Sequence, residues 1–233
     1  MKKAFLILGL AAGTFTASAH GNDGFTEYKP TKGSVTTEAG LVGGILNSEF
    51  SLNNGAGMLR GRYFLKNDLA IRVGLNLGFD NERTNVYGNG SNEGHYTEAN
   101  STFLLNAGIE KHFKGTKRLS PYVGGDILVG TVGYKGKTEN SDGTDYEANL
   151  NITQKSSNFT LGLRGVVGAD YYIAPKVFIG GEVGLGFTKT WDGKSTLEIN
   201  NNGNTTKTDV KSQGSAFSFG PSIVTGVRIG FVF

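Results

Sequence analysis

The sequence predicts an all-β protein, an eight-stranded antiparallel up-and-down transmembrane β-barrel. Eight segments alternate apolar residues with small or polar ones at a period of two, which indicates strands with one apolar face. After the first loop, the connections alternate between short and long, as in barrels that carry turns on one side of the membrane and loops on the other. The chain also begins with the pattern of a secretory signal.

The stretch 215–233 shows the alternation well. One row runs from Phe217 through Ile223 to Phe233 and is mostly apolar, while the other row is mainly Gly, Ser and Val with the single Arg228. Each segment offers the roughly 9–11 residues that a tilted strand needs to cross a bilayer. Because lipid cannot hydrogen-bond to an open sheet edge, the strands must close into a barrel. We expect strands at about 34–46, 56–65, 69–80, 103–113, 122–130, 159–172, 177–187 and 215–233.

The N-terminal segment matches a cleavable export signal. Lys2 and Lys3 are followed by an apolar run over 4–12 and by the Ala-Ser-Ala triplet at 17–19. Such a run is too short to span a bilayer, whereas a basic start and a small-residue cleavage site are typical of secretion. We therefore expect a signal peptide at 1–19, a periplasmic lead-in at 20–33 and one barrel domain at 34–233.

The composition excludes several classes of protein. The chain has 23 Lys and Arg against 20 Asp and Glu. Without Lys2 and Lys3 the balance is 21 to 20, so nothing suggests a nucleic-acid partner. There is no Cys, hence no disulfide and no thiolate metal site. The 37 glycines and 4 prolines fit tight turns and closely packed strands better than helices.

The energetic cost of charge in lipid decides which face of each strand points outward. An arginine facing the bilayer midplane costs about 2–4 kcal/mol, and turning the second strand over would expose both Arg60 and Arg62. The charged rows therefore face the lumen, and alternation also assigns Asp80 and Asp170 to them. Eight strands enclose a lumen that side chains can fill, so we expect paired charges and no wide pore. The predicted lumen charge network is Glu38, Arg60, Arg62, Arg72, Glu110, Asp126, Arg164, Glu182 and Arg228.

The signal and the ending VRIGFVF at 227–233 resemble those of the small outer-membrane β-barrel superfamily, the OmpA/OmpX-like or porin-like proteins. This resemblance implies a monomer in the outer membrane of a Gram-negative-type bacterium, in contact with outer-membrane lipid. It also implies that a terminal Phe with alternate apolar residues before it is recognised by the outer-membrane assembly machinery. In this chain the corresponding residues are Val227, Ile229, Phe231 and Phe233.

Members of that superfamily include adhesion, surface-stability and host-interaction proteins. The resemblance thus favours a non-enzymatic structural or surface-interaction role. The alternatives are a narrow ion or small-solute channel and an outer-leaflet lipid-modifying enzyme. Enzymatic relatives need a His with a Ser or an acid at the outer rim, and His95 is the candidate, whereas His112 beside Glu110 fits a paired lumen residue better. We expect no catalytic, cofactor or metal site, since the carboxylates at 142, 145 and 147 lack the spacing of a calcium loop.

Three long connections, at about 81–98, 136–156 and 192–214, are predicted as polar loops. Within the last, alternating residues at 195–199 and 205–210 flank an Asn-rich turn. We expect a hairpin that continues the last two strands beyond the membrane and exposes an edge to which an extracellular protein partner could add a strand. The stretches 134–137 and 146–153 of the preceding connection are candidates for a second ribbon of this kind. A soluble eight-stranded ligand carrier is disfavoured, because it would bury the arginines among apolar groups and expose the aliphatic rows to water.

Overall fold

The structure, a computed structural model, describes residues 28–41, 57–211 and 214–233. These ranges contain ten strands, and none of their residues forms a helix that is long and apolar enough to cross a membrane. The signal, most of the lead-in and the end of the first predicted strand lie outside the described residues. The strands are β1 Val35–Leu41, β2 Gly57–Lys66, β3 Leu69–Tyr87, β4 Glu93–His112, β5 Leu119–Ser141, β6 Tyr146–Ala174, β7 Val177–Asp192, β8 Ser195–Asn201, β9 Asn204–Val210 and β10 Ser215–Val232.

Eight of these strands close a ring of antiparallel pairs, which confirms the predicted barrel topology. Each of β1 to β6 pairs with the next strand in the chain, β7 pairs with β10, and β10 pairs with β1. The first and last ring strands meet in register from Thr36 opposite Val232 to Leu41 opposite Val227. Because every ring strand has a neighbour on both sides, the ring leaves no open edge over the paired residues.

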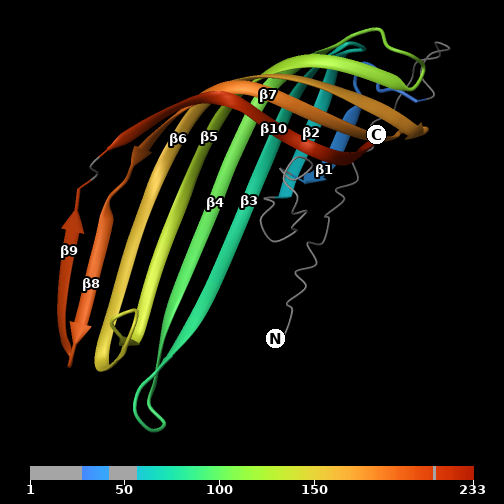
Figure 1. Ribbon diagram of the computed structural model, residues 1–233. Coiled ribbons are helices and arrows are strands. Elements are labelled where there is room, and N and C mark those ends of the chain that lie inside the picture. Colours follow the sequence, from blue (N-terminus) through green and yellow to red (C-terminus); the bar gives the residue numbers. More distant parts are fainter. Residues whose placement is uncertain (1–27, 42–56, 212–213) are drawn as a thin grey trace.

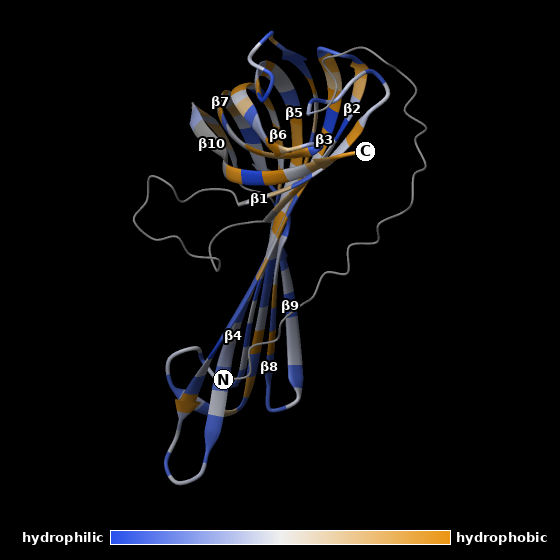
Figure 2. Cartoon of the chain, turned by 90° about the vertical axis from the view of Figure 1, so that its right-hand side faces the viewer, coloured by the Kyte–Doolittle hydropathy of each residue, from blue (hydrophilic) through white to orange (hydrophobic). Residues whose placement is uncertain are grey.

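The two faces of the ring differ as the alternation predicts. Apolar residues at alternate positions of each strand are exposed on the outer face, for example Ile71, Val73, Leu161 and Leu163. Their neighbours along the chain point inward and are largely buried, although many of them are charged. Hydrophobic residues gather on the ring, whereas the part of the sheet beyond it is mostly hydrophilic (Figure 2).

Aromatic residues occupy both ends of the outer face. Phe159 stacks on Trp191 with ring centroids 5.9 Å apart near the end from which β3 to β6 extend, and Phe187 stacks on Phe217 at 6.1 Å. At the opposite end, Tyr171 and Phe231 are exposed near the short turns. Two aromatic girdles that border an apolar band are typical of barrels that lie in a bilayer.

The ring continues on one side as a sheet, which corrects two of the predicted loops. Among the described residues, the pairing of β2 with β3 extends to Leu77 opposite Gly57, whereas β3 stays paired with β4 as far as Tyr87 opposite Glu93. Strands β5 and β6 likewise stay paired to Ser141 opposite Tyr146. Most residues of the predicted loops at 81–98 and 136–156 are therefore strand, and in the second connection this agrees with the ribbon considered for 134–137 and 146–153. We call the result the extended sheet, and its members are 78–87, 93–102, 132–141, 146–158, β8 and β9 (Figure 1).

The hairpin predicted between the last two ring strands is present. β8 and β9 pair with each other, and β8 also pairs with β6 from Thr196 opposite Lys155 to Asn201 opposite Leu150. β7 pairs with β6 up to Asp192 opposite Asn158, so β8 follows β7 alongside the same strand after a short break. The hairpin thus forms one edge of the extended sheet, beside β6, as Figure 1 shows.

Candidate functional site: a charged lumen and an extended sheet

Ten charged side chains fill the ring. They are five arginines and five carboxylates, so their formal charges cancel. Each carboxylate contacts at least two of the arginines, and each arginine contacts at least one carboxylate. We call this group the lumen network, and its members are Arg60, Arg62, Arg72, Arg164, Arg228, Glu38, Glu110, Asp126, Asp170 and Glu182.

Sheet register produces the shortest-range pairs. Glu38 and Arg60 are directly opposite each other on β1 and β2, and Nη2 of Arg60 lies 3.0 Å from Oε2 of Glu38. Asp126 and Arg164 face each other in the same way on β5 and β6, at 2.7 Å. Opposite charges at directly opposed positions stabilise a strand pair, so these contacts also favour the observed register.

One register position is unfavourable by itself. Arg62 and Arg72 are directly opposite on β2 and β3, and like charges at such positions destabilise the pair. Glu110 on β4 lies against both. Its Oε1 accepts from Nη1 of Arg62 at 2.8 Å, and its Oε2 accepts from Nη1 of Arg72 at 3.1 Å. His112 adds a contact to Oε1 at 2.9 Å, so the predicted pairing of His112 with Glu110 is present.

Two inward glycines let ion pairs reach across an intervening strand. Gly108 on β4 lies between Arg72 and Asp126 in register, and a Cβ at Gly108 would lie 2.3 Å from Oδ1 of Asp126. Gly180 on β7 lies between Asp170 and Arg228 in the same way, and its Cβ would lie 2.6 Å from Oδ1 of Asp170. Any side chain at either glycine would separate the charges that meet there.

The structure brings all nine predicted network residues together. Asp170, which alternation places on the same face, joins them through Arg62 and Arg228. Sequence reasoning missed Tyr122, whose hydroxyl donates to Glu182 at 2.5 Å and accepts from Arg228 at 2.6 Å. Its inward position on β5, four residues before Asp126, was the available signal.

Asp80 is the inward-row residue that stays outside the network. It is exposed and lies in the extended sheet, three residues beyond Leu77, which is the last residue of β3 with a partner on β2 among the described residues. The alternation therefore predicts correctly on which face of β3 Asp80 lies, but not its position along the strand.

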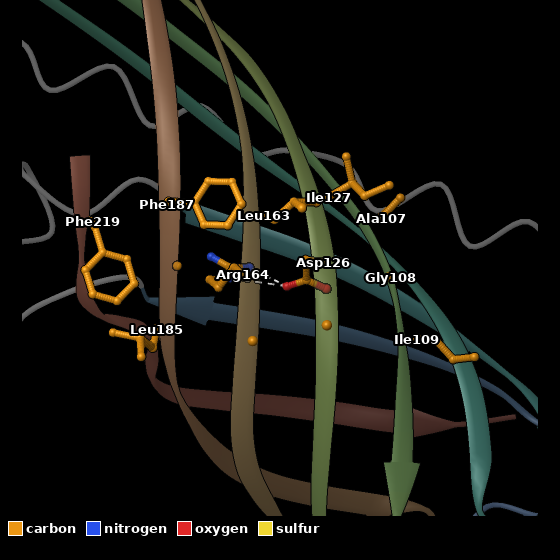
Figure 3. Close-up of a pocket in the computed structure, with 13 residues that line it drawn as sticks. Ala107, Gly108, Ile109, Asp126, Ile127, Leu163, Arg164, Leu185, Phe187 and Phe219 are labelled. Carbon is orange, nitrogen blue, oxygen red and sulfur yellow. Dashed lines mark hydrogen bonds and ion pairs between the residues drawn. The ribbon is translucent and has the colours of Figure 1, made fainter. Parts of the chain in front are cut away.

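The pocket drawn in Figure 3 lies beside the network and has a volume of about 590 Å³. Its lining combines outer-row apolar side chains such as Ile127, Leu163 and Phe187 with the Asp126–Arg164 ion pair. Arg164 is the most accessible network arginine, with 11% of its side chain exposed, whereas the other four are at most 1% exposed. The network is thus closed apart from this corner.

The four predicted assembly residues share one face of β10 and the residue after it. Val227, Ile229, Phe231 and Phe233 are all exposed on the outer face. Phe233 is tied to β1, since its amide donates to the carbonyl oxygen of Val35 at 2.8 Å and its own carbonyl accepts in return at 3.2 Å.

The extended sheet has two edges without a partner strand among the described residues. β9 pairs with β8 on one side only, and the 78–87 part of β3 pairs with β4 only. All seven residues of β9 are exposed. Edges of this kind present unpaired backbone groups that can accept a further strand.

His95, the candidate for a catalytic base, lies in β4 of the extended sheet instead of in a loop. Its Nε2 contacts Glu139, and its Nδ1 lies 3.1 Å from Nη2 of Arg83. Lys137 forms a second ion pair with Glu139. The pKa of Glu139 is lowered chiefly by the hydrogen bond from Lys137. Among the described residues, no group of three or more His, Asp or Glu side chains is placed to hold a metal ion.

The chain is similar to outer-membrane proteins of known structure. No curated protein matches the chain. The solved structures of similar fold include a major outer membrane protein of Thermus thermophilus, with 15% identity, 86% of this chain and 99% of that chain covered, and a TM-score of 0.49. They also include the attachment invasion locus protein Ail of Yersinia pestis, with 14% identity and a TM-score of 0.40, where the match covers 87% of this chain and 100% of that chain. A third is OprG of Pseudomonas aeruginosa, with 15% identity and a TM-score of 0.35, where the match covers 89% of this chain and 99% of that chain.

The sequence profile of the OmpA-OmpF-like porin family matches residues 45–195, which include β2 to β7 and most of the lumen network. This range covers well over half of the chain. The closed ring, its apolar outer face and its charged interior agree with that match. The chain therefore belongs to the OmpA-OmpF-like porin family and is an outer-membrane β-barrel protein.

Proposed function

We propose that this chain is a non-enzymatic surface-interaction protein, in which the barrel is an anchor and the extended sheet binds an extracellular protein partner. The observation that carries the proposal is the contrast between the two parts. The lumen is filled by paired charges, whereas the extended sheet is hydrophilic, reaches beyond the ring and has two edges that no other described strand covers. An extended segment of a partner can add to such an edge through main-chain hydrogen bonds.

The β9 edge is the better of the two edges for this role. The seven residues of β9 are exposed and include three threonines, which favour the extended conformation. Its turn has positive φ at Asn202 and Gly203, as expected for a tight two-residue hairpin that holds β9 in register with β8. A preformed strand reduces the conformational entropy that a partner must overcome on binding.

The test uses the full-length protein in the outer membrane of a host bacterium, with binding to cultured cells and to immobilised matrix proteins as the readout. Deletion of 195–211 removes β8 and β9 and is expected to abolish binding. In the matched control, residues 85–95 are replaced by Asn-Gly between Thr84 and Tyr96, which are register partners. The control shortens the other side of the same sheet and should still bind. Full binding by the deletion variant would contradict the proposal.

A second candidate function is a narrow ion path through the lumen. The name of the family and the partial accessibility of Arg164 support it. In planar bilayers this function requires a steady conductance that disappears when Arg60 or Glu110 is neutralised. A barrel that inserts without such conductance fits the anchor role instead.

We also propose that the exposed row ending at Phe233 is the part of the chain that the outer-membrane assembly machinery binds. Support comes from the outward position of all four residues on the last ring strand. Phe233→Ala should lower the folded fraction in cells but leave refolding of the purified protein into vesicles unchanged. Equal losses in both settings would indicate a role in stability alone.

A further inference from the structure

Two lysines of the extended sheet are placed unfavourably for charges that have no counter-ion. Lys135 on β5 and Lys155 on β6 are directly opposite in register and share the outward face. Like charges at opposed positions destabilise a strand pair. Within the described ranges, neither ammonium group has an ion-pair or hydrogen-bond partner. Glu198 on β8 lies diagonally opposite Lys155, but its direct register partner is Lys207 on β9.

A hollow of about 480 Å³ lies beside the two lysines on the same face. Its floor is made of the small residues Ala99, Ser101 and Gly133, which lie side by side on β4 and β5. Phe79 forms its wall on β3 and is 83% exposed. The hollow therefore joins an apolar surface to a pair of uncompensated positive charges. Asp80 also borders it, but Asp80 belongs to the opposite face of the strand.

The position of the hollow relative to the aromatic girdle sets its level in the membrane. Lys135 follows Thr131, the register partner of Phe159, by four residues, which is about 13 Å along the strand. Phe159 and Trp191 form the girdle that marks the boundary between the acyl chains and the head groups. The lysines thus lie at head-group level, with the hollow between them and the acyl region.

We propose that this hollow is a binding site for an anionic, phosphate-bearing lipid of the outer leaflet. The lipid phosphate lies between Lys135 and Lys155 and offsets their mutual repulsion, while the upper part of an acyl chain packs against Phe79 over the small floor. Charge complementarity favours a lipid with net negative charge over a zwitterionic one, because a choline group already neutralises the phosphate in the latter.

The experiment uses a fluorophore at the hollow. The chain has no cysteine, so Asn81→Cys gives a single labelling site opposite Ala99. The full-length labelled protein is reconstituted in phosphatidylcholine vesicles that contain doxyl-labelled phosphatidylglycerol or doxyl-labelled phosphatidylcholine as quencher. Stronger quenching by the anionic lipid at equal content reports its preferential binding. Gel mobility before and after boiling shows that each variant is folded.

The variants separate charge from shape. Lys135→Gln with Lys155→Gln should lower the preference for the anionic lipid by about five-fold for each lysine. The matched pair Lys114→Gln with Lys117→Gln, on the opposite end of the barrel, should leave it unchanged. Ser101→Phe keeps the charges but blocks the floor, and it should reduce quenching by the anionic lipid.

Three results would overturn the proposal. The first is an unchanged preference in the double lysine variant, and the second is unchanged quenching in Ser101→Phe. The third is displacement of the labelled lipid by millimolar inorganic phosphate at constant ionic strength, which would mean that free phosphate and not a lipid occupies the site. Persistence of the preference in inorganic phosphate is the expected outcome.

Discussion

Replacing Arg72 with methionine perturbs the lumen network at an arginine that contacts three of its five carboxylates. Nε and Nη2 of Arg72 donate to Asp126 at 2.7 and 2.6 Å. Nη1 donates to Glu182 at 2.7 Å and to Glu110 at 3.1 Å. Methionine fills much of the same space but carries no charge and donates no hydrogen bonds. The variant therefore deprives three carboxylates of a partner and leaves the lumen network with a net charge of one negative unit.

The magnitude follows from how many partners remain. Three charged contacts at about 1.5–3 kcal/mol each would suggest a loss of about 4.5–9 kcal/mol. That sum is too high, because each of the three carboxylates keeps another arginine. Removing one partner of a buried ion pair costs about 3–5 kcal/mol, and we expect the free energy of unfolding to fall by this amount. Added salt should change the loss little, since buried pairs are weakly screened.

Urea unfolding in phospholipid vesicles measures the loss. Trp191 is the only tryptophan and lies on the outer face beside Phe159, so its fluorescence changes when the barrel leaves the bilayer. In the double variant Arg72→Met with Asp126→Asn, charge balance is restored, and the two losses should be less than additive by about 0.5–3 kcal/mol. A loss below about 1 kcal/mol for Arg72→Met, or strict additivity, would refute the reasoning.

Two further predictions concern a glycine and a carboxylate. Gly180→Ala forces apart the charges that meet at Asp170 and should cost about 1–3 kcal/mol, whereas Gly220→Ala, with no atom within 4 Å of its added Cβ, should stay within about 0.5 kcal/mol in the same assay. Because the folded-state pKa of Glu139 is depressed, its contribution is present above its ordinary pKa of 4.5 and is lost as the pH falls through the folded value. Amide protection around Glu139 and its register partner His95, corrected for intrinsic exchange, should therefore fall in acid, and the same fall in Lys137→Met would contradict this cause.

The ring could be predicted from the sequence because lipid imposes a simple rule on each strand. An outward charge is costly at membrane depth, so apolar and charged rows separate cleanly, and strands such as β2 reveal their inward face through Arg60 and Arg62 alone. Beyond the ring this rule no longer applies. Most of the extended sheet lies beyond the acyl region, so its strands carry threonine, asparagine and lysine on either face and lack the clear alternation of the ring strands.

The partners within the network could not be predicted in the same way. Alternation along a strand determines which side chains point into the lumen. Which of these side chains form ion pairs depends on the register between strands and on how far each side chain reaches across the lumen. Arg62 pairs with Asp170 from a strand on the other side of the ring, and Arg228 meets Asp170 only because Gly180 stands between them. A sequence separation of 108 residues for the first pair carries no local signal.

Magnitudes favour the anchor role over the ion path. A conducting lumen requires that at least one buried pair separates, which costs about 3–5 kcal/mol. An elementary charge that crosses the full membrane gains about 2.3 kcal/mol per 100 mV, and a side chain inside the ring crosses only part of that distance. Since Glu38 alone contacts Arg60, Arg62 and Arg228, separating one pair also disturbs its neighbours and raises the cost further. The filled lumen is thus the state that the ion pairs maintain, which supports the proposed role of the barrel as an anchor.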